Sequence, residues 1–191
     1  MEQIVLATGN KGKIREFSEA FSHLSIDCVP VKDVITIAEP EETGTTFMEN
    51  ALLKARYYAK VTNRPCLADD SGITVDALNG APGVYSARYV GHHGDDNANN
   101  EKLIRELQGK ADRTAHYVCA LALVYPDGRE VTAEGYCDGL VQDDPKGDNG
   151  FGYDPYFYVP EFKKTMAELS IEEKETISHR GRALRELISK L

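Results

Sequence analysis

The sequence contains no long apolar run, no C-x-x-C pair and no excess of positive charge, and each absence excludes a class of protein. No stretch approaches the ~20 apolar residues that a membrane helix needs. The chain starts Met-Glu-Gln-Ile-Val-Leu-Ala, without the basic start and longer apolar core of a secretion signal, so we expect a cytoplasmic protein. Wide cysteine spacing argues against a zinc site or a disulfide framework and favours buried free thiols. The cysteines are Cys28, Cys66, Cys119 and Cys137.

The charge balance is acidic, with 22 Lys and Arg against 31 Asp and Glu, a net charge of −9. Because phosphate contacts dominate affinity for nucleic acids, this balance argues against a DNA or RNA polymer as partner. A small anionic ligand stays compatible with it, if cations gather locally or a metal bridges the charges. The 191 residues are 41% hydrophobic and show no repeat or linker, which predicts a single domain over residues 1–191.

Apolar spacing predicts strands and helices that intermix along the chain. Thr46 and Glu49 form a capping-box pair at one helix start, and Pro126-Asp127-Gly128 is the turn of a long hairpin. We expect helices at about residues 13–24, from 46 onward, 97–107 and 170–191, and strands at 3–7, 65–68, 73–78, 115–125, 129–136 and 156–159. This mixture predicts an α/β fold with a mixed sheet.

The first expected turn, Thr8-Gly9-Asn10-Lys11-Gly12-Lys13, joins a strand to a helix. Backbone N–H groups at a helix start attract anions, the two lysines add charge, and the Thr and Asn side chains add hydrogen-bonding groups. The pattern is neither a P-loop nor a dinucleotide fingerprint. Two interpretations stay open: an anion site, and a capped helix start with solvated lysines.

Two acidic segments are candidates for a metal site. Asp69-Asp70-Ser71-Gly72 directly follows an apolar strand, and open α/β sheets place their sites at such strand ends. Glu41-Glu42-Thr43-Gly44 precedes a helix, and Glu41 with Asp70 would supply the one or two carboxylates that Mg²⁺ usually takes in phosphate enzymes. The alternatives are a polar turn at 69–72 and an acidic flank favoured by the helix dipole at 41–44.

A loop rich in glycine and aromatic residues, residues 148–155, is a candidate for binding a base. Its glycines let the backbone approach a flat ligand, and Phe151 or Tyr153 can stack on a base. Asp154, expected to be extended before Pro155, can accept hydrogen bonds from a base or a sugar. An ordinary hairpin loop with anchoring aromatic residues is the competing interpretation.

Three late residues, Lys174, His179 and Arg180, offer donors for phosphate and base oxygens. They would not share one face of a straight helix, so their convergence requires a break near residues 178–181. Lys54, on the second expected helix, adds another cation. The alternative is a solvated amphipathic helix.

These motifs resemble those of the inosine triphosphate pyrophosphatases, also called XTP/dITP diphosphatases. They occur in the family's order and run nearly end to end, with the weakest signal over residues 91–145. The motifs are ATGNKGK at residues 7–13, EETGTTF at 41–47, ADDSG at 68–72, GAPGVYSARY at 80–89, GFGYDP at 150–155 and SHRG at 178–181.

The resemblance implies Mg²⁺-dependent hydrolysis of ITP, dITP or XTP between the α and β phosphates, giving the monophosphate and pyrophosphate. It implies an elongated mixed sheet flanked by helices, with two lobes and a central cleft, and a homodimer. It assigns Glu41 and Asp70 to Mg²⁺ and Asp70 also to general-base catalysis; Glu41 against Glu42, and Asp69 against Asp70, are choices of register. The substrate-binding residues that it implies are Thr8, Gly9, Asn10, Lys11, Gly12, Lys13, Lys54, Ser71, Phe151, Gly152, Tyr153, Asp154, Lys174, His179 and Arg180.

Two other functions compete with this one. A nucleotide sensor without catalysis is compatible with the fold, because fold does not fix function, but both Glu41 and Asp70 are present. A Maf-like pyrophosphatase for modified pyrimidine nucleotides would also use Mg²⁺, but residues 151–154 and the His179-Arg180 pair favour a purine. Hydrogen-bond donors facing the 6-position would separate a 6-oxo from a 6-amino purine, and rejection of guanine must involve the 2-position.

Overall fold

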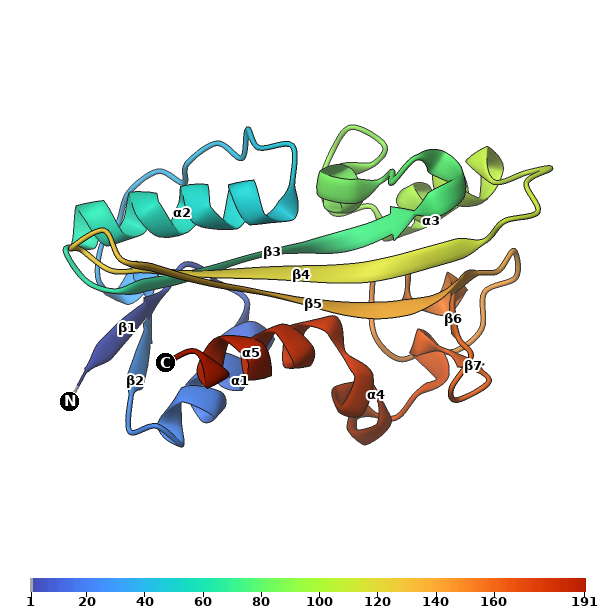
Figure 1. The fold of residues 1–191 in the computed structure, drawn as a ribbon. Helices are drawn as coiled ribbons and strands as arrows, with labels where there is room; N and C mark the ends of the chain where they lie inside the picture. Colours follow the sequence, from blue (N-terminus) through green and yellow to red (C-terminus); the bar gives the residue numbers. More distant parts are fainter. Residues whose placement is uncertain (1) are drawn as a thin grey trace. The chain divides into compact units, whose positions relative to one another are not determined.

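The computed structural model describes residues 2–191, which form a seven-stranded mixed sheet with helices packed on it (Figure 1). The strand order is β2-β1-β3-β4-β5-β6-β7. β1 pairs in parallel with β2 and β3, whereas β6 pairs antiparallel with β5 and β7. The strands are β1 Gln3–Leu6, β2 Asp27–Pro30, β3 Cys66–Val75, β4 Thr114–Val124, β5 Glu130–Val141, β6 Phe157–Val159 and β7 Lys164–Thr165. The predicted α/β class with a mixed sheet flanked by helices is confirmed.

Five α-helices and five short 3-10 helices lie within residues 2–191. The α-helices are α1 Lys11–Ser22, α2 Phe47–Thr62, α3 Asp96–Glu106, α4 Ile171–Ile177 and α5 His179–Ser189. The 3-10 helices are η1 Val31–Asp33, η2 Asp76–Leu78, η3 Gly83–Arg88, η4 Asp154–Tyr156 and η5 Met166–Glu168. Over the same residues, none of the helices is long and apolar enough to cross a membrane.

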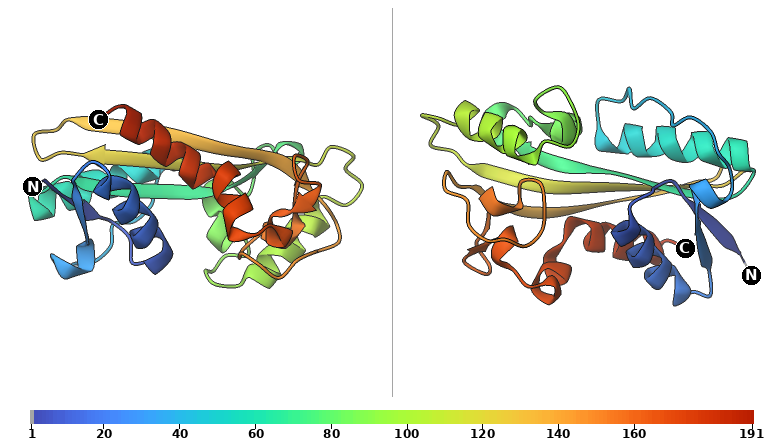
Figure 2. Two further views of the ribbon diagram at one scale, coloured as in Figure 1. Left: turned by 90° about the horizontal axis from the view of Figure 1, so that it is seen from below. Right: turned by 180° about the vertical axis from the view of Figure 1, so that it is seen from behind.

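The chain divides into two compact units. The first contains the residues up to Asp70, Cys119–Gly135 and Arg182–Leu191, and the second contains Ser71–Val118 and Tyr136–Gly181. In the first unit, α2 lies on one face of the sheet and α1 and α5 lie on the other (Figures 1 and 2). The core on the α1 and α5 side is made by aliphatic and aromatic side chains that are almost fully buried. They include Ile4, Leu6, Phe17, Phe21, Leu67, Leu121, Leu123 and Leu187.

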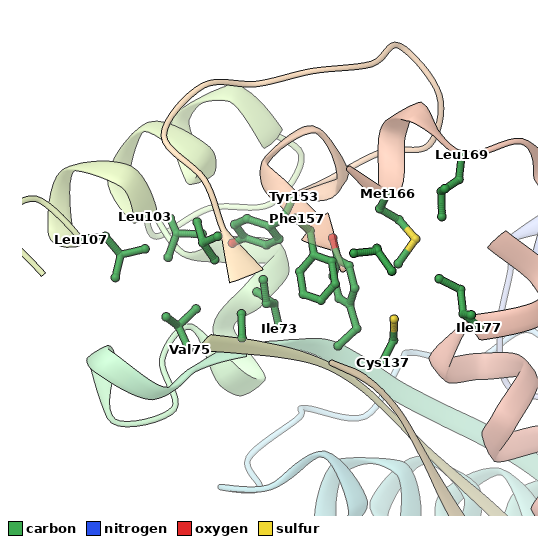
Figure 3. Close-up of a cluster of buried hydrophobic side chains, with 14 residues drawn as sticks. Ile73, Val75, Leu103, Leu107, Cys137, Tyr153, Phe157, Met166, Leu169 and Ile177 are labelled. Atoms are coloured by element: carbon green, nitrogen blue, oxygen red, sulfur yellow. The ribbon is translucent and has the colours of Figure 1, made fainter. Parts of the chain in front are cut away.

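The second unit has its own core, which Figure 3 shows from close by. Phe157, fully buried on β6, packs against Tyr117 of β4 with ring centroids 4.3 Å apart. The other members include Ile73, Val75, Leu103, Leu107, Tyr153, Met166, Leu169 and Ile177. Burying one such side chain contributes about 1.5–3 kcal/mol, so this cluster fixes the backbone of the loops that leave it.

Strand β3 differs from the prediction, because a single strand, Cys66–Val75, replaces two short strands with a turn between them. The expected interruption at 69–72 is wrong, and so is the alternative of a polar turn there. The strand continues because both carboxylates in it have partners: Lys13 pairs with Asp69, and Asn50 donates to Asp70. Gly72 then passes close to Ser86, where a Cβ would lie 2.8 Å from the Ser86 Cβ. The acidic pair therefore lies within a strand and not after its end.

The C-terminal segment also differs from the prediction. One helix over 170–191 was expected, and the structure has two, α4 and α5, separated at Ser178. Ser178 is extended, with φ −61° and ψ 140°, and its Oγ accepts a hydrogen bond from the Gly181 backbone N–H. The break that the three late cations required near 178–181 is thus present. The short strands β2 and β7 were not predicted, because neither shows a clear alternation of apolar residues.

Candidate active site

The turn between β1 and α1 is a capped helix start. Asn10 is the N-cap, and its Oδ1 accepts from the Lys13 backbone N–H at 3.0 Å, while the Thr8 Oγ1 accepts from the Asn10 N–H at 3.2 Å. The side chains of Thr8 and Asn10 are therefore used locally, which supports the capping interpretation. Lys13 connects this turn to the acidic residues, because its Nζ lies 2.8 Å from the Asp69 Oδ2.

Asp69 and Asp70 point to opposite faces of β3, as successive residues of a strand do. Asp69 is 4% exposed and pairs with Lys13 of α1, whereas the Asp70 Oδ2 accepts from the Asn50 Nδ2 of α2 at 3.1 Å. The two helices lie on opposite faces of the sheet (Figure 1). The alternation of one strand thus separates the two carboxylates into different surroundings.

Lys54 of α2 connects β3 with the segment that carries Glu42. Its Nζ donates to the Asp69 backbone carbonyl at 2.6 Å and lies 2.9 Å from the Glu42 Oε1. Burial alone would lower the pKa of Lys54, but the surrounding carboxylates of Asp69, Glu42 and Asp70 outweigh it and raise that pKa. Lys54 is therefore a cation at neutral pH. We call Glu42, Asp69, Asp70, Lys13 and Lys54 the acidic cluster.

Asp70 is the carboxyl group with the most unusual environment in the acidic cluster. Burial, together with the charges of Glu42 and Asp69, raises its pKa from 3.8 to about 6, although Lys54 and the Asn50 hydrogen bond act in the opposite direction. A carboxylate with a pKa close to neutrality is suited to accept a proton. It is also a group that a divalent cation would stabilise in its charged form.

The segment that carries Glu42 is held against α2 by its glycine and its threonines. The Gly44 backbone N–H donates to the Asn50 Oδ1 at 2.8 Å, and a Cβ at Gly44 would lie 2.7 Å from that oxygen. Thr46 caps α2 as predicted, but Glu49 completes the reciprocal bond with the Thr45 backbone N–H rather than with that of Thr46. This arrangement brings Glu42, although exposed like Glu41, within 2.9 Å of the Lys54 Nζ and so into the acidic cluster.

In the second unit, Asp154 is the centre of a buried hydrogen-bond network. It is 4% exposed, and its Oδ1 accepts from the Tyr117 hydroxyl at 2.7 Å. Its Oδ2 accepts from the Lys174 Nζ at 2.9 Å and from the Phe151 backbone N–H at 3.1 Å. The prediction that Asp154 is extended is wrong. It begins η4, because its carbonyl accepts from the Phe157 N–H and its side chain turns back to Phe151.

Tyr117 links this carboxylate to the C-terminal helices. Its ring stacks on the imidazole of His179, with centroids 5.1 Å apart and an interplanar angle of 17°. Lys174 lies on α4 and His179 starts α5, so the break at Ser178 allows both to reach the same network. Burial and the charge of Asp154 raise the pKa of Tyr117, which stays a neutral donor. We call Tyr117, Phe151, Asp154, Lys174 and His179 the Asp154 network.

Phe151 is the exposed member of this network. Its ring is 69% exposed, and the Lys174 Nζ lies 5.3 Å from its centroid, within range of a cation–π contact. Gly150, at φ +73°, makes room for the carboxylate, because a Cβ there would lie 3.2 Å from the Asp154 Cβ and closer still to its carboxyl atoms. Tyr153 points the other way, is 7% exposed, and donates to the Ser86 carbonyl at 2.6 Å. Tyr153 is thus a core residue.

The remaining predicted residues are adjacent to these groups in the chain. Lys11 is exposed at the first position of α1, and among residues 2–191 no heavy atom lies within 4 Å of where a Gly9 Cβ would be. Ser71 follows Asp70 on β3, and Arg180 follows His179 on α5, both of intermediate exposure.

Sequence reasoning missed four residues that the structure brings to these sites. Asn50 holds Asp70, Tyr117 holds Asp154, and Asp96 and Asn100 of α3 hold the backbone of Gly152. Tyr117 and Asp154 are 37 positions apart, and Asp96 and Gly152 are 56 apart. A local sequence motif cannot predict contacts between residues so far apart in the chain. For Asn50 there was a signal, because it is a polar residue on the apolar face of a predicted helix.

Comparison with known proteins agrees with this geometry. The model of the Ham1 family matches residues 4–190. A dITP/XTP pyrophosphatase of Bacillus anthracis is 51% identical over all of this chain and 96% of its own length, and that of Listeria innocua is 49% identical over 98% and 93%. The solved structure of the Staphylococcus aureus Ham1 protein superposes with a TM-score of 0.95 at 45% identity, covering 99% of this chain and 97% of its own. With a family model over nearly its whole length and relatives aligned end to end, the chain belongs to the Ham1 family.

Proposed function

We propose that this protein hydrolyses aberrant purine nucleoside triphosphates (dITP, ITP and XTP) to the monophosphate and pyrophosphate. The observation that carries the proposal is the acidic cluster, in which the charges of Glu42, Asp69 and Lys54 act on Asp70, whose pKa is about 6. The substrate class is supported by the names of the relatives, dITP/XTP pyrophosphatases about half identical over the full chain. Removing such nucleotides keeps aberrant bases out of the nucleotide pool.

The donor set fits Mg²⁺. Carboxylate oxygens are its preferred ligands, and the mutual repulsion of Glu42, Asp69 and Asp70, which contributes to the raised pKa of Asp70, would be relieved by a divalent cation. Over residues 2–191, no group of three or more His, Cys, Asp or Glu has the geometry of a metal site. In phosphate enzymes, Mg²⁺ is usually held by one or two protein carboxylates, with water and phosphate oxygens completing its shell. When bound, Mg²⁺ supplies charge neutralisation and lowers the pKa of water.

We assign the protein ligands of Mg²⁺ to Glu42 and Asp70. Glu41 was the ligand expected from the family resemblance, with Glu42 as the alternative. Glu42 is supported because its Oε1 lies 2.9 Å from the Lys54 Nζ and because its charge acts on Asp70. Glu41 remains the alternative, and comparing the Mg²⁺ dependence of Glu41→Gln and Glu42→Gln decides between them.

In this proposal different residues of the chain accept the proton of the attacking water and neutralise the charge of the phosphates. Asp70 takes the proton of the attacking water, since a pKa near 6 leaves it ionised yet basic at neutral pH. Lys13 and Lys54, held by Asp69, offset the charge of the polyphosphate. The first-turn amides of α1 add donors, with Thr8–Lys13 binding phosphate oxygens. Phosphoryl transfer needs this positioning and charge neutralisation more than covalent chemistry.

The residues proposed for the base belong to the Asp154 network. The exposed ring of Phe151 offers a stacking surface, and Lys174 and His179 offer donors for the 6-oxo group, with Arg180 and Ser71 as further substrate contacts. A donor facing the 6-amino group of adenine would lose its partner, which makes discrimination strong. Asp154 already accepts three hydrogen bonds, so we propose that it orients Lys174 and Phe151 instead of contacting the base itself.

Product analysis tests the reaction. The purified protein is incubated with Mg²⁺ and dITP, and dIMP, pyrophosphate and orthophosphate are quantified separately. The proposal predicts dIMP and pyrophosphate in equal amounts and no turnover after chelation with EDTA. Orthophosphate as the sole phosphate product would contradict cleavage between the α and β phosphates.

Three further proposals concern the molecule as a whole: it is a single domain over residues 1–191, it forms a homodimer, and it acts in the cytoplasm. Light scattering of the full chain tests the second, because a monomer mass would contradict it. Cooperative unfolding tests the first, because two separate transitions would indicate two domains.

A further inference from the structure

Helix α3 holds Gly152 by both of its backbone polar groups. The Gly152 N–H donates to the Asp96 Oδ2 at 3.1 Å, and the Asn100 Nδ2 donates to the Gly152 carbonyl at 2.9 Å. Asp96 and Asn100 are four positions apart and therefore lie on the same face of α3. Two side chains of one helix thus hold the two peptide units that flank the Gly152 Cα, in the loop that carries Phe151.

The helix that makes this grip is itself well anchored. The Asp95 side chain caps its start by accepting from the Ala98 N–H at 2.9 Å, and Leu103 is fully buried in the core. The Asn99 Oδ1 accepts from the Val90 N–H at 3.0 Å, and Lys102 donates to the Tyr89 carbonyl at 2.8 Å. Because α3 is fixed on two sides, the position of Gly152 is fixed with it.

The asparagine at position 100 carries a cost in folding stability. It is 5% exposed, and among the described residues its Oδ1 is buried without a hydrogen-bond partner. An unsatisfied buried acceptor is destabilising, so an apolar residue of similar size would suit the fold at least as well. The hydrogen bond from its Nδ2 to Gly152 is the contact that explains an amide here.

Gly152 is the point of the loop that most needs such a grip. Its φ of +61° lies in the left-handed region, where a glycine is favoured, and a glycine brings conformational freedom. It joins the exposed Phe151 to the buried Tyr153. Without the grip, the Phe151 backbone would have its hydrogen bonds with Asp154 alone to hold it.

We propose that Asp96 and Asn100 are positioning residues that fix the Phe151 ring for the base. The proposal rests on the function proposed above in one respect, the assignment of Phe151 to the base. In this proposal α3 contributes to substrate specificity, although the side chains of Asp96 and Asn100 do not contact the base. The grip is preformed, so Phe151 is ordered before the nucleotide arrives and less entropy is lost on binding.

A fluorescence experiment tests the grip without reference to catalysis. The chain has no tryptophan, so Phe151→Trp provides a single reporter. In that background, Asp96→Ala and Asn100→Leu should lower the anisotropy of the reporter and raise its acrylamide quenching about two-fold, as expected for a loop that moves on the nanosecond timescale. Asp96→Asn keeps an acceptor oxygen and should behave like the parent. Glu101→Ala, next to Asn100 but exposed, is the matched control.

Steady-state kinetics with native Phe151 then test the consequence. Asp96→Ala and Asn100→Leu should raise KM for dITP about 10-fold with kcat changed less than about 3-fold, as for lost ground-state binding. Asp96→Asn should restore KM. Asp96 is exposed, so its variants test the idea even where Asn100→Leu fails to fold.

Each result separates the two proposals. Unchanged anisotropy and quenching in Asp96→Ala would overturn the grip, whatever the enzyme does. A protein that never hydrolyses dITP would overturn the proposed function, while the reporter still decides on the grip. A loose reporter with unchanged KM would overturn the positioning role.

Discussion

Replacing Asp70 by Asn should stabilise the metal-free protein while abolishing turnover. Burial and the neighbouring carboxylates raise the pKa of Asp70 from 3.8 to about 6. At about 1.36 kcal/mol per pH unit, this difference corresponds to a penalty of about 3 kcal/mol for carrying the charged form in the native state. Asn has no charge to bury, and its side-chain oxygen can still accept the Asn50 hydrogen bond that Asp70 accepts at 3.1 Å.

The sign follows from the direction of the pKa shift. A group whose native pKa is raised stabilises the fold fully below its unfolded value, near 3.8, and that stabilisation is lost as the pH rises through about 6. The advantage of Asp70→Asn should therefore be only about 0.5 kcal/mol at pH 4 and reach about 2–3 kcal/mol at pH 7.5. Mg²⁺ should reduce it, since the cation stabilises the native carboxylate of the wild type.

Urea unfolding in EDTA, followed by circular dichroism at several pH values, measures this difference. The neighbouring variant Asp69→Asn is the control, and it should have the opposite sign, a loss of about 1–3 kcal/mol, because it breaks the nearly buried ion pair with Lys13. Asp70→Asn should also bind dITP while failing to turn it over. A less stable Asp70→Asn at pH 7.5, or a difference independent of pH, would refute the reasoning.

Three other changes have expected outcomes. Gly72→Ala should destabilise the fold by about 1–3 kcal/mol in thermal unfolding, because its Cβ would lie 2.9 Å from the Gly83 carbonyl oxygen; an unchanged Tm would contradict this close approach. Tyr117→Phe should cost about 1–3 kcal/mol in urea unfolding and weaken dITP binding, since a buried carboxylate loses a donor; full stability would count against the network. His116, whose pKa is raised by its hydrogen bond to Asp138 and by Asp76, should stabilise the fold below about pH 6.5 and lose this effect as the pH rises; a His116→Gln variant equally stable relative to wild type at pH 5.5 and pH 9 would disprove it.

The sequence predicted much of the fold where the pattern is local. The start of α2 follows from Thr46 and Glu49, and the hairpin of β4 and β5 follows from its turn at 126–128. The interruption placed at 69–72 was wrong because it rested on polarity alone. Partners far away in the chain, Lys13 and Asn50, satisfy those polar side chains and let the strand continue.

The sequence predicted which residues belong to the site better than it predicted which residues contact each other there. Asp70, Lys13 and Lys174 were named, but their surroundings depend on contacts between distant segments. Asp154 illustrates the difference: from the sequence we expected a ligand for a base, and its three hydrogen-bond donors lead us to propose that it positions Lys174 and Phe151. Helix α3 was predicted, but periodicity cannot tell which loop a helix face will hold.

The ratio of kcat/KM for dITP to that for dATP, with Mg²⁺ present and pyrophosphate as the monitored product, tests the central claim most directly. Donors arranged for a 6-oxo purine should give a ratio of at least about 100, because adenine leaves them unpaired. A ratio near 1, with pyrophosphate released from both nucleotides, would contradict the account of the Asp154 network as the part that recognises the base.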